Sequence, residues 1–334
     1  MLTKNLDDNW STWHHRLHKE FLRDQKLIPK GSDLLIAVSG GQDSMAMLNL
    51  INDIRIHHQW NIYVWHGNHK WHEKSNHFAN ALKKYCESKD INFYSDTAIN
   101  VDINSEEKAR DWRYQKLCEK VDELSIKNNL IHPIHILTGH TSSDNAETFL
   151  MNLARGSNYS GLSGIQRKRF LNEKYSLIRP LLIFSREDTK EICKSLNVPV
   201  WEDPTNSDLD IKRNIIRINI LDHLEKIYPG CTNRINNFIE KMNSYGKEQS
   251  DLSQLALISC SSINGVNRIL FKKLGKEARA TILNRFIKDK CIKQISSKHI
   301  NDLSFQIINK SNGTINLPEG WTMTWDKEFI EIKN

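Results

Sequence analysis

Short apolar, β-branched segments alternate with longer segments of helical spacing along the first two-thirds of the chain. The pattern predicts strands over 33–40, 61–69, 91–98 and 134–140, and helices over 43–58, 74–90, 105–129 and 144–154. Strands that alternate with helices of this length are typical of a doubly wound, mainly parallel sheet. We therefore expect an α/β fold whose ligand lies at the carboxyl ends of the strands, where Ser39, His66 and His140 fall.

Both ends of the chain depart from this alternation. The first 25 residues have the pattern of an amphipathic leading helix, and residues 156–180 are rich in Gly, Ser and Lys and are predicted to form a loop. Pro229 and Gly230 interrupt the chain, and a basic helix at 274–291 and strand-like pieces at 313–333 follow. We expect a leading helix over 1–26, a catalytic domain over 27–222 and a smaller, mostly helical C-terminal domain over 223–334.

Composition and charge narrow the class of protein. The 334 residues are 39% hydrophobic and 26% charged, with no apolar run near the roughly 20 residues that span a bilayer. The six cysteines form no C-x-x-C pair, and the first residues lack a secretory apolar region. We expect a protein of a reducing compartment, the cytoplasm or a plastid stroma, with no membrane partner.

The net charge of +7 is unevenly distributed. Residues 221–334 hold 17 Lys and Arg against 12 Asp and Glu, so this third of the chain carries +5. Such a surplus is compatible with a polyanionic partner and equally with a surface that keeps the protein in solution.

The segment Ser39-Gly40-Gly41-Gln42-Asp43-Ser44 joins the first predicted strand to the first predicted helix. Backbone N–H groups, small hydroxyls and a helix N-terminus then converge on one point, which is a phosphate-binding arrangement. We expect both glycines to adopt positive φ and to let the backbone approach an anion closely. A carboxylate beside an anion site implies a cation, so Asp43 is predicted to bind Mg²⁺.

This loop differs from two common nucleotide-binding motifs. No Lys follows the glycines as in a P-loop NTPase, and the spacing is not the G-x-G-x-x-G of a dinucleotide-binding protein. It resembles the SGGxDS loop of the ATP pyrophosphatase (PP-loop) group, whose fold is adenine nucleotide alpha hydrolase-like. The resemblance implies ATP as a substrate, cleaved between its α- and β-phosphates.

Further segments resemble the tRNA(Ile)-lysidine synthase family over about residues 30–225, and more faintly beyond. They are HGNHKWH (66–72), EEKARDWRYQKL (106–117), LTGHTSSDNAETFLMNLARGSNYSGLSGI (137–165), LIRPLLIFSREDTKEI (177–192) and DPTNSDLDIKRNIIRINIL (203–221). The resemblance implies adenylation of the C2 oxygen of the wobble cytidine in a CAU anticodon of tRNA(Ile). The ε-amine of L-lysine then displaces AMP, which changes decoding from AUG to AUA and charging from Met to Ile.

The resemblance also assigns site residues. It implies catalytic roles for His140, Asp144, Arg179 and Arg213. It implies ATP binding by the glycine loop (Ser39, Gly40, Gly41, Gln42, Asp43 and Ser44) and by His66. It implies contacts to lysine or tRNA from Arg110, Arg113, Tyr114, Glu147, Arg155 and Arg217.

The acidic segment permits two interpretations. Asp144 and Glu147 are spaced i, i+3 on one helix, where they can orient and deprotonate the lysine amine or merely cap the helix. Ser143 stands where the family usually has the first Asp of an Asp-Asp pair. Which carboxylate removes the proton from the lysine amine therefore stays open. His72 replaces a usual Arg. Asp203 and Asn206 fit a turn as well as a substrate contact.

Several alternatives remain at this stage. A tRNA thiolase is disfavoured because sulfur transfer needs a reactive thiol pair or a cluster, and an ammonia-using synthetase because no glutaminase segment is visible. A zinc site at His66, His69, His72 and His140 is disfavoured because no cysteine assists. A nucleotide-sensing or RNA-binding module without catalysis, a homodimer, and bacterial or plastid origin all stay open.

Overall fold

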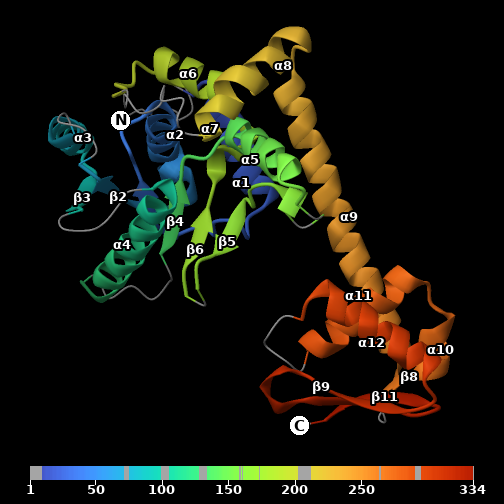
Figure 1. The fold of residues 1–334 in the computed structure, drawn as a ribbon. Helices are drawn as coiled ribbons and strands as arrows, with labels where there is room; N and C mark the ends of the chain where they lie inside the picture. The colour runs from blue at the N-terminus through green and yellow to red at the C-terminus, as the bar shows by residue number, and fades with distance from the viewer. Residues whose placement is uncertain are drawn as a thin grey trace. The chain divides into compact units, whose positions relative to one another are not determined.

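The computed structural model describes residues 10–70, 75–98, 105–127, 134–157, 159, 161–172, 174–201, 212–262, 265–289 and 295–333 (Figure 1). The chain forms two compact units, residues 1–240 and 241–334. The division lies inside helix α9 (Cys231–Cys260), later than the predicted boundary between residues 222 and 223. The predicted division after residue 222, between a catalytic domain and a C-terminal domain, stays a prediction.

A six-stranded sheet organises the first unit, in the order β3-β2-β1-β4-β6-β5. Neighbouring strands are parallel except for the edge pair β5 and β6, which is antiparallel. The expectation of a doubly wound, mainly parallel sheet is confirmed. The strands are β1 (Asp33–Ala37), β2 (Asn61–Asn68), β3 (Asn92–Thr97), β4 (His135–Thr138), β5 (Lys168–Phe170) and β6 (Ser176–Ile178). Strand β5 lies in a segment predicted to be a loop.

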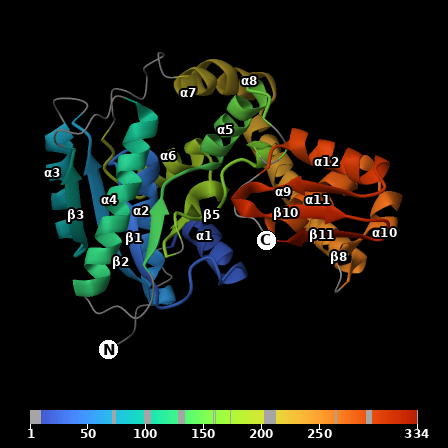
Figure 2. The same ribbon diagram turned by 60° about the horizontal axis from the view of Figure 1, so that its bottom comes forward.

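Helices cover both faces of this sheet, so the strands are buried on both sides (Figures 1 and 2). Leu34 and Ile36 of β1 face a core shared with helices α1, α2, α3 and α6, whereas Leu35 between them faces a core shared with α4. The leading helix is therefore part of the first unit. The helices are α1 (Thr12–Arg23), α2 (Gln42–His58), α3 (Ser75–Ser88), α4 (Glu106–Lys127), α5 (Ser142–Ala154) and α6 (Arg186–Ser195).

Irregular helical segments complete the first unit. A 3₁₀ turn η2 (Gly161–Ser163) precedes β5, and another, η3 (Pro180–Ile183), follows β6. Helix α7 (Lys212–Ile215) continues through a π-helical turn η5 (Ile216–Leu221) into α8 (Asp222–Ile227). π-helical turns occur most often at functional sites, and this one carries Arg217.

The second unit combines helices with an antiparallel sheet in the order β7-β8-β11-β10-β9. Its core includes Phe271, Leu283, Ile307 and Met323, all buried. The basic helix predicted from the sequence is α11 (Lys276–Lys288). The other elements are β7 (Ser261–Ser262), β8 (Gly265–Asn267), α10 (Arg268–Lys273), α12 (Ser297–Asn309), β9 (Gly313–Asn316), η6 (Pro318–Gly320), β10 (Thr322–Trp325) and β11 (Phe329–Lys333).

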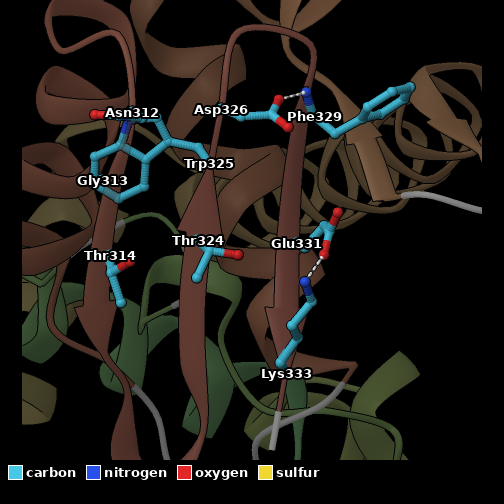
Figure 3. A pocket seen from close by; sticks show the side chains of 9 residues that line it. All are labelled: Asn312, Gly313, Thr314, Thr324, Trp325, Asp326, Phe329, Glu331 and Lys333. Atoms are coloured by element: carbon cyan, nitrogen blue, oxygen red, sulfur yellow. Dashed lines mark hydrogen bonds and ion pairs between the residues drawn. The ribbon is translucent and has the colours of Figure 1, made fainter.

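The polar face of this sheet carries a shallow hollow of about 340 Å³ (Figure 3). Thr314, Thr324 and Glu331 stand side by side on it because they are register partners on β9, β10 and β11. None of the site residues predicted from the sequence lines the hollow. Among the described helices, none combines the length and apolar character needed to cross a bilayer.

Candidate active site

The site is built where the strand order reverses. β1 pairs with both β2 and β4, and the chain leaves these strands toward opposite edges of the sheet, so the loops after β1 and β4 meet. Gly139 permits the contact, since a Cβ at this position would lie 3.1 Å from the Cα and backbone nitrogen of Ser44. The sequence analysis missed Gly139, although a glycine between a buried strand and His140 was a visible signal.

The glycine loop is held by its own serine. Ser44 Oγ accepts hydrogen bonds from the backbone nitrogens of Ser39 and Gly40, each at 3.2 Å, and donates to the carbonyl of Gly41 at 2.9 Å. Ser39 Oγ lies 3.1 Å from Ser44 Oγ. The loop is therefore held in shape by its own side chains, and the first N–H groups of α2 have no intrahelical acceptors.

The two glycines differ in conformation. Gly40 has φ +94° and lies under Trp201, whose ring carbon would be 3.2 Å from an added Cβ. Gly41 has φ −73° and is the N-cap of α2, so the expectation of positive φ at this position is wrong. A cap with extended backbone already aims the helix N-terminus, and only one left-handed residue is needed to turn the chain.

Asp43 lies on the first turn of α2 and is mostly buried. One carboxylate oxygen accepts the hydroxyl hydrogen of Thr189, and the other lies 3.6 Å from an Nη of Arg186. Burial raises the pKa of Asp43 to about 6, with the charge of Asp144 acting in the same direction and Arg186 opposing it. A buried carboxylate with incomplete pairing is suited to a cation.

The side chain of Gln42 bonds helix α6. Its amide donates to the carbonyl of Arg186 at 2.7 Å and to Thr189 Oγ1 at 2.8 Å. Both acceptors belong to α6, so the side chain of Gln42 ties α2 to α6.

Asp144 serves helix α5 and the site at once. Its Oδ2 accepts from the backbone nitrogen and hydroxyl of the N-cap Thr141 at 2.7 and 2.9 Å, and its Oδ1 accepts from Arg213 Nη2 at 2.7 Å. Burial opposes ionisation, but the guanidinium of Arg213 and the bonds from Thr141 hold the pKa of Asp144 below its usual value. The capping interpretation is confirmed, and a role of Asp144 toward the lysine amine stays a prediction.

Glu147 is fully buried one turn further along α5, at 0% exposure. Its Oε2 accepts from Arg213 Nε at 2.7 Å, so one guanidinium bridges both acids of the helix. Within the described ranges, Glu147 Oε1 has no hydrogen-bond partner. Burial, and then the charge of Asp144, raises the pKa of Glu147 against the opposing effect of Arg213.

Two of the predicted site histidines have lowered pKa values. His140 Nδ1 lies 3.1 Å from Thr138 Oγ1, and burial lowers the pKa of His140 to about 4, with Arg179, Arg213 and Arg113 adding to the effect and Asp144 opposing it. His66 donates from Nδ1 to the carbonyl of Val38 at 2.8 Å, which leaves Nε2 as the acceptor. Burial lowers its pKa despite that bond.

Arginines form the other side of the cluster. Arg179 is only 6% exposed, donates to the carbonyl of Gln166 at 2.6 Å and bonds Tyr114; burial lowers its pKa against the effect of Tyr114. The pKa of Arg217 is lowered by burial and then by Arg186, and Glu147 opposes the shift. The predicted residues that the structure gathers by contact or charge are Asp43, Arg113, Tyr114, His140, Asp144, Glu147, Arg179, Arg213 and Arg217.

Two predicted substrate residues lie away from this cluster. Arg155 is exposed at the C-cap of α5, about 16 Å along the helix axis from Asp144 at about 1.5 Å per residue. Arg110 is exposed on α4, one turn before Tyr114. His72, Asp203 and Asn206 lie outside the described residues.

Helix α6 supplies residues that the sequence analysis did not single out. Arg186 and Thr189 both contact Asp43, and the backbone nitrogen of Arg186 donates to Ser143 Oγ at 3.0 Å. Ser143, which stands where the family usually has an acid, therefore joins α5 to α6. The only local signal was a capped helix start, Ser185 with Asp188, directly after an apolar run.

A glycine loop for ATP phosphates at the switch point of a parallel sheet, faced by carboxylates and arginines, defines an ATP-using enzyme of the PP-loop class. Residues 12–224 match the family model described as PP-loop domain. The chain belongs to the tRNA(Ile)-lysidine synthase family. It is 57% identical to the tRNA(Ile)-lysidine synthase of Prochlorococcus marinus subsp. pastoris over 97% of each chain, and 35% identical to that of Parasynechococcus marenigrum over 97% of this chain and 95% of the relative.

A solved structure supports the fold. The U34-tRNA thiolase NcsA from Methanococcus maripaludis matches with a TM-score of 0.53 and 17% identity, over 69% of this chain and 79% of that one. The predictions of the PP-loop fold and of a ligase that forms a carbon–nitrogen bond are confirmed.

Proposed function

We propose that the cluster around Arg213 carries both steps of lysidine formation on tRNA(Ile), with L-lysine and Mg²⁺·ATP as the other substrates. The observation that carries the proposal is the bridge from Arg213 to Asp144 and Glu147 beside the glycine loop. ATP use follows from the PP-loop family, whereas lysine, Mg²⁺ and the residue roles are assigned from the chemistry of the site.

In the first step, the loop from Ser39 to Ser44 binds the phosphates of ATP. The C2 oxygen of the wobble cytidine forms a bond to the α-phosphorus, the bond from the α-phosphorus to the bridging oxygen breaks, and pyrophosphate leaves. Arg113 and Arg179 stabilise the charge that develops on the α-phosphate. His140 is neutral at physiological pH and serves as a hydrogen-bonding group.

Asp43 fits a magnesium site because its carboxylate is largely buried and its charged partner, an Nη of Arg186, lies 3.6 Å away, beyond hydrogen-bond distance. Mg²⁺ commonly takes one or two protein carboxylates together with phosphate oxygens and water. Asp43 would hold the cation, which when bound would supply charge neutralisation to the phosphates of ATP.

In the second step, the lysine ε-amine attacks C2, the bond from C2 to the oxygen of AMP breaks, and AMP leaves. The amine must be neutral to attack, so a base has to take its proton. Glu147 is the better candidate because Oε1 lacks a partner within the described ranges and burial raises its pKa. Both oxygens of Asp144 are occupied, so Asp144 fixes Arg213 instead.

We further propose that residues 223–334 contact the tRNA and that the enzyme acts in the cytoplasm, or in a plastid stroma. The second compact unit holds 15 Lys and Arg against 9 Asp and Glu, a net charge of +6, which favours an RNA partner. A homodimer stays a prediction from the sequence.

The first test is incorporation of radiolabelled lysine into unmodified tRNA(Ile) with a CAU anticodon, with and without ATP. Wild type is expected to label the tRNA only with ATP, and Asp43→Ala is expected to lose at least about a hundredfold in rate because the phosphates lose their cation ligand. Asp302→Ala, an exposed acid on α12, is the matched control and keeps full activity. Pyrophosphate release without labelling would mean that the nucleophile or the RNA is wrongly assigned.

A further inference from the structure

Thr189, a buried residue of helix α6, contacts Asp43 of the glycine loop. Thr189 lies on α6 at 0% exposure, and its hydroxyl donates to Asp43 Oδ1 across 146 residues of sequence. The same hydroxyl lies 2.9 Å from the carbonyl of Arg186, which is an alternative acceptor for its single hydrogen.

Gln42 affects which of these two acceptors takes the Thr189 hydrogen. Its amide nitrogen carries two hydrogens, of which one goes to the Arg186 carbonyl at 2.7 Å and one to Thr189 Oγ1 at 2.8 Å. The carbonyl already accepts one hydrogen bond and is neutral, so the charged carboxylate of Asp43 is the stronger acceptor for the threonine hydrogen. Gln42, Thr189 and Asp43 form a one-way chain of hydrogen bonds.

Arg186 competes with Thr189 for the carboxylate of Asp43. An Nη of Arg186 lies 3.6 Å from Asp43 Oδ2, beyond hydrogen-bond distance but within reach after a small rotation of the carboxylate. If the carboxylate turned to form a full ion pair with Arg186, it would be less available to a cation at the phosphates. The bond from Thr189 to Oδ1 opposes that rotation.

We infer that Thr189, directed by Gln42, is a positioning residue that holds the carboxylate of Asp43 toward the phosphate site and away from Arg186. The inference rests on the proposed role of Asp43 in binding Mg²⁺·ATP. Neither Thr189 nor Gln42 is expected to touch the reacting atoms.

The test compares Thr189→Val, which removes the hydroxyl and keeps the shape, with Thr189→Ser, which restores it. Calorimetry measures the binding of ATP with Mg²⁺ and with EDTA, and labelling measures KM for ATP and kcat. Thr189→Val is expected to weaken Mg²⁺·ATP binding about tenfold and to leave metal-free ATP binding unchanged, since a hydrogen bond to a charged group is lost. Thr189→Ser is expected to restore most of the affinity.

A double-mutant cycle tests the direction of the chain. Gln42→Leu frees the Arg186 carbonyl to take the threonine hydrogen, so it should weaken Mg²⁺·ATP binding in the same sense. Added to Thr189→Val, it should weaken binding no further. Ser195→Ala, which removes a hydroxyl that donates to the carbonyl of Ile192 on the same helix, is the matched control.

Different outcomes test the positioning role of Thr189 and the magnesium role of Asp43. Equal losses of ATP affinity with and without Mg²⁺, or no rescue by Ser, would reduce Thr189 to a packing residue and overturn the inference. Wild type that binds and uses ATP equally well in EDTA would instead overturn the magnesium role of Asp43. Thermal unfolding of each variant shows whether a lost affinity reflects lost folding.

Discussion

At the scale of single residues, the site depends on the shape of one guanidinium. Arg213 presents Nε to Glu147 and Nη2 to Asp144, each at 2.7 Å, and so pairs with two buried acids from one plane. A lysine carries the same charge on one nitrogen and cannot reproduce this fork. Arg213 therefore orients both acids on α5 and favours the ionised form of each.

Arg213→Lys is expected to lower kcat/KM for lysine by about tenfold to a hundredfold, because Glu147 loses its alignment while the charge stays. Single-turnover labelling at saturating ATP, with lysine varied, measures the effect. Arg23→Lys, at an exposed position at the end of α1, is the matched control. An equal loss in both variants, or none in Arg213→Lys, would contradict the role given to the bridge.

Single residues also show how far sequence reasoning extends. The loop at Ser39–Ser44 was predictable because its chemistry lies in six consecutive residues between a strand and a helix. Thr189 and Gly139 were missed because their importance comes from contacts with residues far along the chain. Gln42 was assigned to ATP binding for its position, whereas its side chain bonds α6.

At the scale of elements, the leading helix is fixed to α2 by an apolar and aromatic contact. Leu17 and Phe21 are buried, and His58 at the end of α2 stacks on Trp60 with ring centroids 4.1 Å apart. His58 Nε2 also lies 3.0 Å from His18 Nδ1 of α1. Burial, and then the nearby His18, His57 and Lys30, lowers the pKa of His58 to about 4.

This contact is expected to weaken in acid. The folded state binds fewer protons than the unfolded state between pH 6.5 and about 4, so the stability that neutral His58 contributes is present above pH 6.5 and is lost as the pH falls through that window. His58→Gln is expected to be less stable than wild type at pH 7. This gap, the difference in the free energy of unfolding between the two proteins, should shrink by about 1 to 2 kcal/mol at pH 5.

Urea unfolding of both proteins at the two pH values measures that gap. Burial also lowers the pKa of His135 and His140 to about 4, so wild type and variant share a remaining slope that cancels in the difference. His299→Gln, at an exposed position on α12, is the control for a histidine substitution away from this contact. A gap for His58→Gln that does not change between the two pH values would remove His58 from the acid sensitivity.

Helices and strands could be predicted from the sequence where the local hydrophobic pattern is that of the element found in the fold. The strands at 33–40 and 61–69 and the helix at 43–58 match β1, β2 and α2 closely, because each has a continuous apolar run or helical spacing. The edge strand β5 was missed because Lys168 and Arg169 do not read as buried, and pairing with β6 defines it. The C-terminal sheet likewise depends on pairing between short segments that carry little signal alone.

At the scale of the whole molecule, positive charge is concentrated in one unit. Residues 241–334 carry +6 of the net +7, so the unit that holds the candidate active site is nearly neutral overall. Charge neutralisation of RNA phosphates by lysine and arginine releases counterions and makes binding depend on salt. The second unit is therefore expected to supply most of the salt-dependent affinity for tRNA.

Not every cation of α11 contributes equally to that affinity. Arg285 donates to Ser250 and Gln254 of α9, so its guanidinium is already engaged within the unit. Lys276 is exposed at the start of the helix. Arg285 is thus expected to anchor α11 to α9, and Lys276 to face the RNA.

Lys276→Gln is accordingly expected to weaken tRNA binding and to reduce the slope of log affinity against log salt by about 0.7 to 0.9, the loss of one phosphate contact. Arg285→Gln should leave the slope unchanged and lower the melting temperature, since it removes bonds between helices rather than to RNA. Filter binding of tRNA(Ile) from 50 to 200 mM salt, with thermal unfolding alongside, measures both. The reverse pattern would place Arg285 on the RNA and Lys276 outside the interface, because only a cation that displaces counterions can move the slope.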